Sequence, residues 1–175
     1  MRTEFEHGVI RDWSEHDKAD LVALANNRKI WRNLTDRFPH PYTERDANWW
    51  IAHVAGMPVR TSWAIEVDSR AIGGIGIDPR EGIYAKSAEF GYWLGEPYWG
   101  RGIATAAARA LVPEIMSRFG LIRLEARVFA WNPASMRVLE KAGFKREGVM
   151  RRAAFKDGVL IDQVLYAYVE ENIDV

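Results

Sequence analysis

The first regular pattern of hydrophobic positions along the chain has the period of an α-helix. Between Trp13 and Asn27, the apolar residues Leu21, Leu24 and Ala25 lie three and four positions apart, so they would share one face of a helix. We therefore expect an amphipathic helix over Trp13–Asn27 that turns this face toward a core.

A stiff loop and a second helix should follow. Within Phe38–Tyr42, two prolines bias the residues before them away from helical backbone, so this stretch is expected to be extended. Thr43 is a favourable N-cap, and the acidic Asp46 three positions later completes a typical helix start. The predicted helix ends near Gly56 and Pro58.

The middle of the chain has the composition and alternation of β-strands. Ser62–Val67 and Ala71–Ile77 are two strand-like runs, and the polar residues Asp68–Arg70 between them predict a hairpin turn. In Ala88–Leu94, apolar side chains alternate with Glu, Gly and Trp, which predicts a third strand. A turn at Gly95–Pro97 should end it.

A long helix and a second group of strands are expected in the C-terminal half. The helix, from about Gly100 to Phe119, has apolar residues at intervals of four and contains Pro113, which should kink it. After it we expect a strand over Leu121–Phe129, a short helix over Pro133–Ala142, and strands over about Phe144–Ala153 and Leu160–Val169. Strands crossed by helices in this way predict a mixed α/β or α+β sheet.

Length and composition favour a single domain over residues 1–175, because a chain of 175 residues fits one core. No apolar run approaches the ~18 residues of a membrane span, and the first residues lack the apolar stretch of a secretory signal. A cytoplasmic protein without membrane contact is therefore expected. The chain has no cysteine, and its four histidines lack the spacing of zinc ligands, so no metal is expected.

The charges balance in total but are unevenly distributed. Residues 100–152 hold 11 Lys and Arg against 4 Glu and no Asp, although the whole chain has a net charge of zero. Such a basic region either reflects chance variation of surface charge or suits a polyanionic ligand. The basic residues are scattered among apolar ones, so nucleic acid is not the expected partner.

The segment from Trp99 to Thr105 carries the most specific chemical signal. It follows a predicted strand and opens a predicted helix, whose first amides are unpaired and attract phosphate. Gly100 and Gly102 allow a ligand to approach the backbone closely, and Arg101 adds a positive charge. Taken alone, the segment is equally compatible with an ordinary junction between a turn and a helix.

Two other phosphate-binding motifs do not fit. A Walker A loop requires Lys and Ser or Thr after its last glycine, but Ile103 and Ala104 follow Gly102. A dinucleotide fingerprint requires a third small residue where Thr105 stands, and the glycine-rich stretch Gly73–Gly76 leads to no helix. Nucleotide phosphotransfer is therefore disfavoured.

Two runs of the sequence resemble the GNAT superfamily of acetyltransferases. One is AEFGYWLGEPYWGRGIATAA, and the other is NPASMRVLEKAGF, which also forms a capped helix pattern with Asn132 as N-cap and Gly143 as its stop. With FPHPYTERDA upstream, the order and spacing are most similar to the RimJ/RimL branch, over about Val9 to Tyr168. The resemblance implies a GNAT fold, with a twisted, mostly antiparallel sheet of six to seven strands, helices on both faces and splayed central strands.

The resemblance implies that acetyl-CoA is the donor and assigns the residues that bind it. Backbone amides would hold the pyrophosphate, although Trp99 stands where the family has Gln or Arg. The strand ending at Leu94 would separate from the strand beginning at Leu121, and the pantetheine arm would pair with the freed edge. Arg137 or Lys141 would meet the outer phosphate. The residues expected to bind the cofactor are Trp93, Leu94, Gly100, Arg101, Gly102, Ile103, Ala104, Thr105, Asn132, Ser135 and Lys141.

The expected catalytic residues depart from a common family pattern. Many relatives have a tyrosine acid seven residues after the asparagine, but Leu139 occupies that position here. By resemblance, Ser135 would instead protonate the departing thiolate, or it is only a hydroxyl in the first helical turn. Glu89 is the candidate base for the amine, or it is a solvated or paired carboxylate. Weaker candidates on the acceptor side are His40, Tyr42 and His53.

The sequence therefore predicts an N-acetyltransferase in which a primary amine attacks acetyl-CoA directly in a ternary complex, with backbone donors stabilising the oxyanion. The acceptor would be a protein N-terminus or a small-molecule amine, such as an amino acid, a polyamine or an aminoglycoside-like compound. Because the tyrosine is missing, a non-catalytic acyl-CoA sensor or scaffold stays open, and a homodimer is possible. The aromatic residues Phe38, His40, Tyr42, Trp49 and Trp50 would belong to the acceptor side or to the core.

Overall fold

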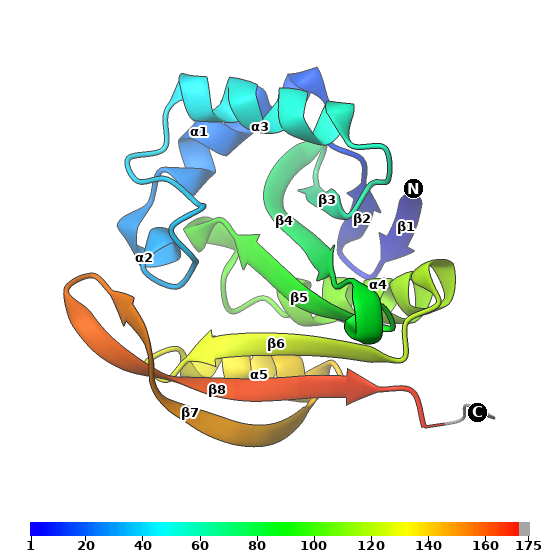
Figure 1. The fold of residues 1–175 in the computed structure, drawn as a ribbon. Coiled ribbons are helices and arrows are strands. Elements are labelled where there is room, and N and C mark those ends of the chain that lie inside the picture. Colours follow the sequence, from blue (N-terminus) through cyan, green and yellow to red (C-terminus); the bar gives the residue numbers. More distant parts are fainter. Residues whose placement is uncertain (172–175) are drawn as a thin grey trace. The chain divides into compact units, whose positions relative to one another are not determined.

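The computed structural model describes residues 1–171, which divide into two compact units (Figure 1). The N-terminal unit contains Met1–Gly76 and Tyr92–Ala107, and the C-terminal unit contains Ile77–Gly91 and the chain from Ala108 onward. In chain order, the elements are β1 Arg2–Phe5, β2 Gly8–Arg11, η1 Glu15–Asp17, α1 Lys18–Ala25, α2 Arg28–Trp31, α3 Glu44–Gly56, β3 Ser62–Val67, β4 Arg70–Pro79, η2 Gly82–Tyr84, β5 Ser87–Leu94, η3 Glu96–Tyr98, α4 Ile103–Phe119, β6 Arg123–Phe129, α5 Pro133–Lys141, β7 Lys145–Lys156 and β8 Val159–Val169, where η marks a 3-10 helix.

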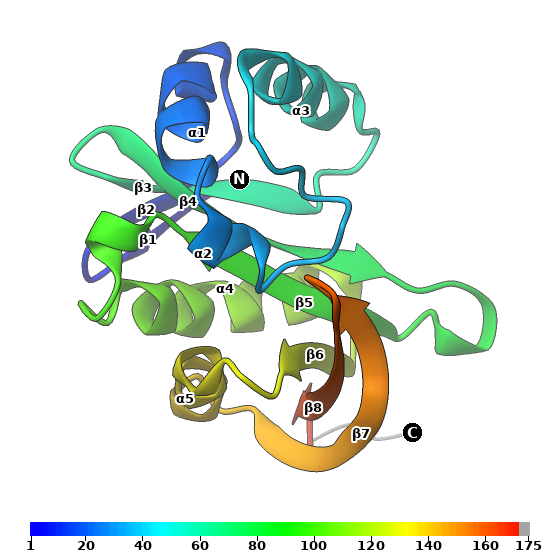
Figure 2. The ribbon, with the colours of Figure 1, turned by 90° about the vertical axis from the view of Figure 1, so that its left-hand side faces the viewer.

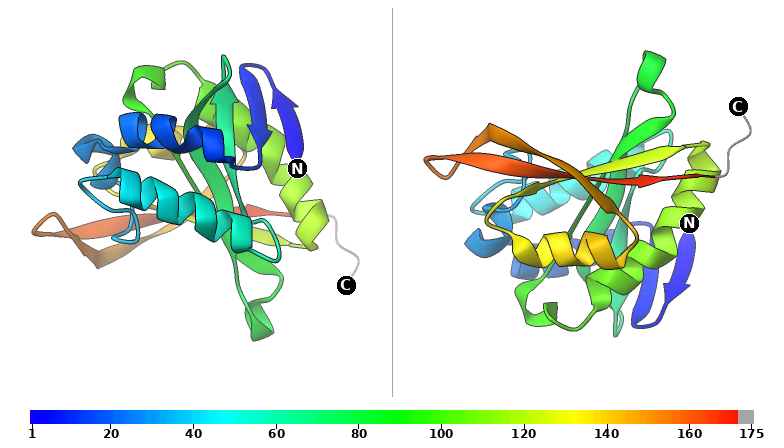
Figure 3. Two further views of the ribbon diagram at one scale, coloured as in Figure 1. Left: turned by 90° about the horizontal axis from the view of Figure 1, so that it is seen from above. Right: turned by 90° about the horizontal axis from the view of Figure 1, so that it is seen from below.

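Four antiparallel strands form the sheet of the N-terminal unit, in the order β1-β2-β3-β4. Helices α1 and α3 lie side by side over one face of these strands (Figure 2; Figure 3, left). Side chains of these helices and Tyr42, just before α3, form a buried cluster of Leu21, Ala25, Tyr42, Ala47 and Ile51. Leu21 and Ala25 of the predicted apolar face belong to this cluster, whereas Leu24 is only partly buried.

Two predicted features of this unit are confirmed. At the start of α3, the N–H and the hydroxyl of Thr43 both donate to the Asp46 carboxylate, at 2.8 and 2.6 Å. These hydrogen bonds hold the pKa of Asp46 below its usual value. Strand β3 spans Ser62–Val67 as predicted, and Asp68 and Ser69 turn the chain into β4 with φ angles of 49° and 60°. Two residues at positive φ give a turn whose twist matches the flanking strands.

The prediction of one helix over Trp13–Asn27 was wrong at both ends. At the start, the Asp17 carboxylate accepts the Ser14 N–H at 2.8 Å, which closes the short turn η1 before α1 begins. At the end, the Asn27 side chain accepts the Lys29 N–H at 2.8 Å and caps a separate short helix, α2. Polar side chains that bind the nearby backbone thus leave a 3-10 turn and a shorter α-helix within the segment, and a third helix begins directly after it.

The sequence analysis did not predict β1 and β2, so the described residues contain eight strands rather than six or seven. Each of the two strands has only 4 residues. Alternation over so few positions does not distinguish a strand from an extended tail. The pairing from Arg2↔Arg11 to Phe5↔Gly8, and that of β2 with β3, supplies the missing backbone partners.

The C-terminal unit contains a mixed sheet. The first residues of β5 pair in parallel with β6, and β6, β8 and β7 follow in antiparallel order. Helix α5 packs against β6 and β7 (Figure 3, right). Strand β6 begins two residues later than predicted, because the Leu121 N–H still donates to the Met116 carbonyl of α4 at 2.9 Å.

The α+β class, with mixed and mostly antiparallel pairing, is confirmed. Among the described residues, the parallel register of β5 with β6 ends at Glu89↔Glu125, although β6 itself continues to Phe129. The expected separation of the central strands requires such an end to the pairing. Pro113 lies inside α4, as the sequence indicates.

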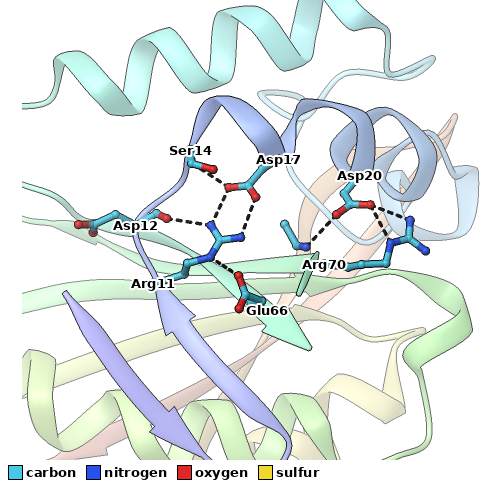
Figure 4. Close-up of polar contacts among 8 residues, drawn as sticks. Arg11, Asp12, Ser14, Asp17, Asp20, Glu66 and Arg70 are labelled. Atoms are coloured by element: carbon cyan, nitrogen blue, oxygen red, sulfur yellow. Dashed lines mark hydrogen bonds and ion pairs between the residues drawn. The ribbon is translucent and has the colours of Figure 1, made fainter. Parts of the chain in front are cut away.

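An ion-pair network joins β2, η1 and β3 in the N-terminal unit (Figure 4). The Arg11 guanidinium donates to both carboxylate oxygens of Asp17, at 2.7 and 2.8 Å, and to Glu66. Asp17 is only 3% exposed, and a buried carboxylate requires such a partner. Nearby, Asp20 of α1 accepts two hydrogen bonds from the exposed side chain of Arg70.

The substitution Arg11→Met should lower the free energy of unfolding by about 3 kcal/mol, because it leaves the Asp17 carboxylate buried without its cation. Urea denaturation measures this loss. Arg70→Gln is the matched control, because it removes an exposed partner from Asp20 and should have a much smaller effect. Equal losses of unfolding free energy in the two variants would contradict the conclusion that Arg11 compensates the buried charge of Asp17.

Candidate functional site

The turn between β5 and α4 is held by short-range hydrogen bonds in the N-terminal unit. The Gly95 N–H donates to the Ile72 carbonyl of β4 at 2.8 Å, and the Trp99 N–H donates to the Glu96 carbonyl at 3.1 Å. The Trp99 indole N–H donates to the Leu94 carbonyl at 2.6 Å. The turn therefore folds back onto the end of β5.

The Glu96 carboxylate anchors this turn on α2. It accepts a hydrogen bond from Asn27 Nδ2 at 2.7 Å and forms an ion pair with Lys29. Asn27 is also the N-cap of α2, so one residue caps the helix and anchors the turn. The hydrogen bonds from Lys29 and, second, from Asn27 hold the pKa of Glu96 below its ordinary value.

Two glycines in left-handed backbone conformations lead into α4. Gly100 and Gly102 have φ angles of +75° and +77°, a region that residues with a side chain rarely adopt. The expected helix start at Gly100 was therefore three residues too early, and α4 begins at Ile103. Its first hydrogen bond runs from the Ala106 N–H to the Gly102 carbonyl, at 3.0 Å.

The first amides of α4 form a site that suits an anion. The N–H groups of Ile103, Ala104 and Thr105 precede Ala106, whose N–H is the first donor to a carbonyl of this turn, so the helix itself offers them no partner. The first turn of α4 contains no acidic residue. Arg101 adds a guanidinium at the same end, 5.6 Å from the centre of the Tyr98 ring. The partial charge of the helix and this cation both favour phosphate.

The glycines at the start of the stretch Gly73–Gly76 in β4 allow Trp93 of β5 to lie close to the backbone. A Cβ at position 73 would lie 2.3 Å from the Trp93 carbonyl oxygen, and one at position 74 would lie 2.7 Å from Trp93 Nε1. Only glycine permits so close an approach. The Trp93 ring also packs against Phe38, with ring centres 5.6 Å apart. These contacts account for the stretch without a bound nucleotide.

In the C-terminal unit, Asn132 and Ser135 together open α5. Asn132 Oδ1 accepts the Ser135 N–H at 3.2 Å, and the Asn132 N–H donates to the Phe129 carbonyl at the end of β6 at 2.8 Å. The predicted N-cap is confirmed, and Gly143, with φ of +96°, ends the helix as predicted. Leu139 is 1% exposed, so the position that holds a tyrosine in many relatives belongs here to the core.

Two hydrogen bonds fix the last turn of α5. The Tyr166 hydroxyl of β8 donates to the Glu140 carboxylate at 2.7 Å, and Arg109 Nε of α4 donates to the Lys141 carbonyl at 2.7 Å. Burial and, second, the hydrogen bond to Glu140 raise the pKa of Tyr166 to about 12. Lys141 itself is exposed, as a ligand of an outer phosphate must be.

Glu89, the candidate base, faces a cation. Its side chain is 39% exposed, and its Oε2 lies 3.8 Å from Nη1 of Arg127 on β6. Glu125, opposite Glu89 in the strand register, is bonded to Arg80 at 2.6 Å and to Arg123 at 2.9 Å. Burial opposes the ionisation of Glu125, but Arg123 and Arg80 outweigh it and lower the pKa of this carboxyl. Both glutamates therefore lie in one network of arginines.

Sequence reasoning missed this network. Arg123, Glu125 and Arg127 alternate along β6 with buried apolar residues, and that alternation is visible in the sequence. It predicts one charged face for the strand. The pairing of β6 with β5 is a tertiary contact, however, so the neighbours of Glu89 could not be identified from the sequence.

The aromatic residues of the expected acceptor side divide between core and surface. Tyr42 is 5% exposed and lies with Phe38 at the buried cluster of α1 and α3, where burial raises the pKa of its hydroxyl. Trp49 is 60% exposed and stacks on His53, with ring centres 4.8 Å apart. His40 stacks on a tryptophan of α2 at 5.6 Å. Of these side chains, the structure therefore places Tyr42 in the core and leaves His40, Trp49 and His53 exposed.

Within residues 1–171, no three His, Asp or Glu side chains are placed to hold a metal ion together. In the same part of the chain, every helix is too short or too polar to cross a membrane.

The chain matches the model of the acetyltransferase (GNAT) domain family over residues 9–145, and it belongs to this family. The relative named "Probable N-acetyltransferase YjcK", from Bacillus subtilis (strain 168), is 38% identical over 105 residues, which are 60% of this chain and 58% of YjcK. The chain thus spans little more than half the length of this relative. The L-amino acid N-acetyltransferase AaaT of Escherichia coli (strain K12) is 26% identical over 166 residues, 93% of this chain and 98% of AaaT.

A solved structure supports the same family and branch. Mycobacterium smegmatis RimJ in complex with CoA-disulfide has a TM-score of 0.83 and 25% sequence identity with this chain, and the alignment covers 98% of this chain and 87% of RimJ. The similarity to the GNAT superfamily and its RimJ/RimL branch is therefore confirmed.

The substitution Tyr166→Phe tests the bond that holds α5. The pKa of Tyr166 is raised from 10.0 to about 12 in the fold, so its stabilising contribution is complete below pH 10 and is lost as the pH rises toward 12. The variant should be about 1 kcal/mol less stable than the wild type at neutral pH. Urea unfolding across this pH range should show the difference shrinking above pH 10, and a constant difference would contradict the assignment.

Proposed function

We propose that this chain is an acetyl-CoA-dependent N-acetyltransferase that transfers an acetyl group to a primary amine. The observation that carries the proposal is the uncapped start of α4, preceded by two left-handed glycines and a cation, in a member of the acetyltransferase (GNAT) domain family. RimJ, which has a similar fold, is in complex with a coenzyme A disulfide, and this supports the same donor here.

In this proposal, backbone amides of the turn hold the pyrophosphate. A Cβ built at Gly100 would have no described atom within 4 Å, so there is room for phosphate oxygens beside the backbone. The amides of Ile103, Ala104 and Thr105 supply donors, and Arg101 supplies charge. Because backbone groups do the binding, Trp99 can replace the Gln or Arg of the family pattern. On α5, the exposed side chains of Arg137 or Lys141 would pair with the outer phosphate.

The pantetheine arm would pair with the backbone of β5 near Trp93 and Leu94. The end of the β5–β6 register at Glu89 supports this proposal, because an added strand requires free backbone groups. Asn132 uses its side-chain oxygen for the Ser135 N–H, so its Nδ2 hydrogens are the donors that it would offer to the arm.

Acetyl transfer requires an unprotonated amine, so a base must take a proton from the ammonium group. Glu89 takes this proton in the proposal. The amine nitrogen then attacks the thioester carbonyl carbon, backbone N–H groups stabilise the oxyanion, and the C–S bond breaks. Ser135 gives its hydroxyl proton to the departing thiolate. The nitrogen loses its second proton as the amide forms, and this proton, relayed through water, restores the Ser135 hydroxyl. Leu139 has no proton to give and is buried.

The acceptor is proposed to be a protein N-terminus or a small-molecule amine. The branch similarity supports the first class, and the similarity to the L-amino acid N-acetyltransferase AaaT supports the second. A turnover screen with acetyl-CoA against peptides, free amino acids and polyamines distinguishes them. A non-catalytic acyl-CoA sensor is the second candidate function, favoured by the apolar Leu139, and acetyl-CoA binding without turnover of any amine would support it.

Gly102→Glu should weaken acetyl-CoA binding by about 100-fold or more, because it places a negative charge beside the pyrophosphate. Isothermal titration calorimetry measures this effect. Gly158→Glu is the matched control: Gly158 has the same φ of +77° and an open Cβ position in the turn between β7 and β8. This substitution introduces similar backbone strain and the same charge outside the proposed site, so the variant should bind acetyl-CoA with the affinity of the wild type. Unchanged affinity in the Gly102 variant would refute the loop assignment.

Glu89→Gln should lower kcat by about 100-fold while the Kd for acetyl-CoA changes less than about threefold, because general-base catalysis contributes a factor of this size. Ser135→Ala should also lower kcat in the same steady-state assay. Glu147→Gln, which removes another carboxylate of the arginine network, is the control and should turn over normally. A Glu89→Gln variant of normal turnover would exclude Glu89 as the base.

A further inference from the structure

The side chain of Trp99 combines an exposed ring with an inward hydrogen bond. Its surface is 43% exposed, yet its indole N–H donates to the Leu94 carbonyl at 2.6 Å. Trp99 is thus only partly buried, and the hydrogen bond of its N–H fixes the orientation of the ring. The acceptor, Leu94, is the last residue of β5, and Gly100 follows Trp99 directly.

Residues between Leu94 and Gly100 form a closed and tightly bonded turn. The Tyr98 N–H donates to the Gly95 carbonyl at 3.0 Å and the Trp99 N–H donates to the Glu96 carbonyl at 3.1 Å. The Trp99 indole closes the turn across its base. The distance from the strand end to the left-handed glycine is thus set by one side-chain hydrogen bond and two backbone ones.

We propose that Trp99 is a positioning residue that sets the spacing between the β5 edge and the pyrophosphate turn, and so makes the chain selective for a complete coenzyme A thioester over shorter thioesters. This inference rests on the proposed function. The two ends of the ligand bind on either side of the turn that Trp99 closes, near Leu94 and near Gly102. The indole itself contacts the turn, not the reacting atoms.

The physical reason is that a ligand made of two weakly binding halves gains affinity from their linkage only when the two sites are held at a fixed separation. A rigid turn lets the second half of the ligand bind at a high effective concentration. A loosened turn must be ordered again on each binding event, which weakens the complete ligand and leaves each half unaffected. The bond should therefore matter for acetyl-CoA and not for its separate parts.

Trp99→Phe removes the indole N–H, and calorimetry should be carried out with three probes: acetyl-CoA, acetyl-pantetheine and ADP as a pyrophosphate probe. Acetyl-CoA should bind roughly fivefold to tenfold more weakly, the range of one net hydrogen bond. Acetyl-pantetheine and ADP should bind within about twofold of the wild type. The KM for acetyl-CoA should rise, and the KM for acetyl-pantetheine should not.

Two further variants keep the test decisive. Replacing the indole of Trp99 by benzothiophene keeps the ring and deletes only the N–H, so it should reproduce the Phe result even if Trp99→Phe folds poorly. Trp13→Phe deletes another indole N–H of the same unit, which lies 3.4 Å from the Ser62 hydroxyl, and it should leave all three affinities unchanged.

Unchanged acetyl-CoA affinity in the Trp99 variants would overturn the inference, and so would an equal loss for ADP, which indicates a merely structural role. If the wild-type chain binds ADP and acetyl-pantetheine no more weakly than acetyl-CoA, the turn does not couple two halves of one ligand. A wild-type chain that binds none of the probes would contradict the proposed function itself, which is a distinct result.

Discussion

The proposed donor site depends on a helix that begins without a capping side chain. Gly102 immediately precedes α4 and has no side chain to cap it, and the first turn of the helix has no acidic residue that could satisfy the amides. A capping side chain would stabilise the helix by about 1 kcal/mol, but it would occupy the donors that an anion needs. Contacts outside the helix offset this loss: Glu96 anchors the turn on α2, and Trp99 binds the carbonyl of Leu94. The hydrogen bonds of the preceding turn thus hold the start of α4 in place while its first N–H groups stay without a capping side chain.

Features that neighbouring residues determine could be predicted from the sequence, and features that distant partners determine could not. The cap of α3 depends on Thr43 and a carboxylate three positions later, so it was predicted correctly. The start of α1 was wrong because the Asp17 carboxylate closes η1 on the Ser14 N–H and also binds Arg11 of β2, a strand that was not predicted. Strands β1 and β2 are short. β2 pairs with β3, which lies far along the chain, and β1 pairs with β2.

The same distinction applies to the candidate site. The proposed donor turn is a contiguous stretch of sequence, so its glycines and the helix after it could be predicted. Only the first residue of that helix, α4, was misplaced. The surroundings of Glu89 depend on the register between β5 and β6, which places Glu125 opposite it and Arg127 at 3.8 Å. The burial of Leu139 is likewise a tertiary fact, and it explains why an apolar residue is tolerated where relatives have a tyrosine.

The hydrogen bond between Asn27 and Glu96 joins residues 69 positions apart. Closing a loop of that length has an entropic cost that local contacts do not repay, so the bond forms only when much of the N-terminal unit is already in place. This contact couples α2 to the turn before α4. A change in α2 that removes Asn27 would also remove an anchor of that turn, even though the two lie far apart in the sequence.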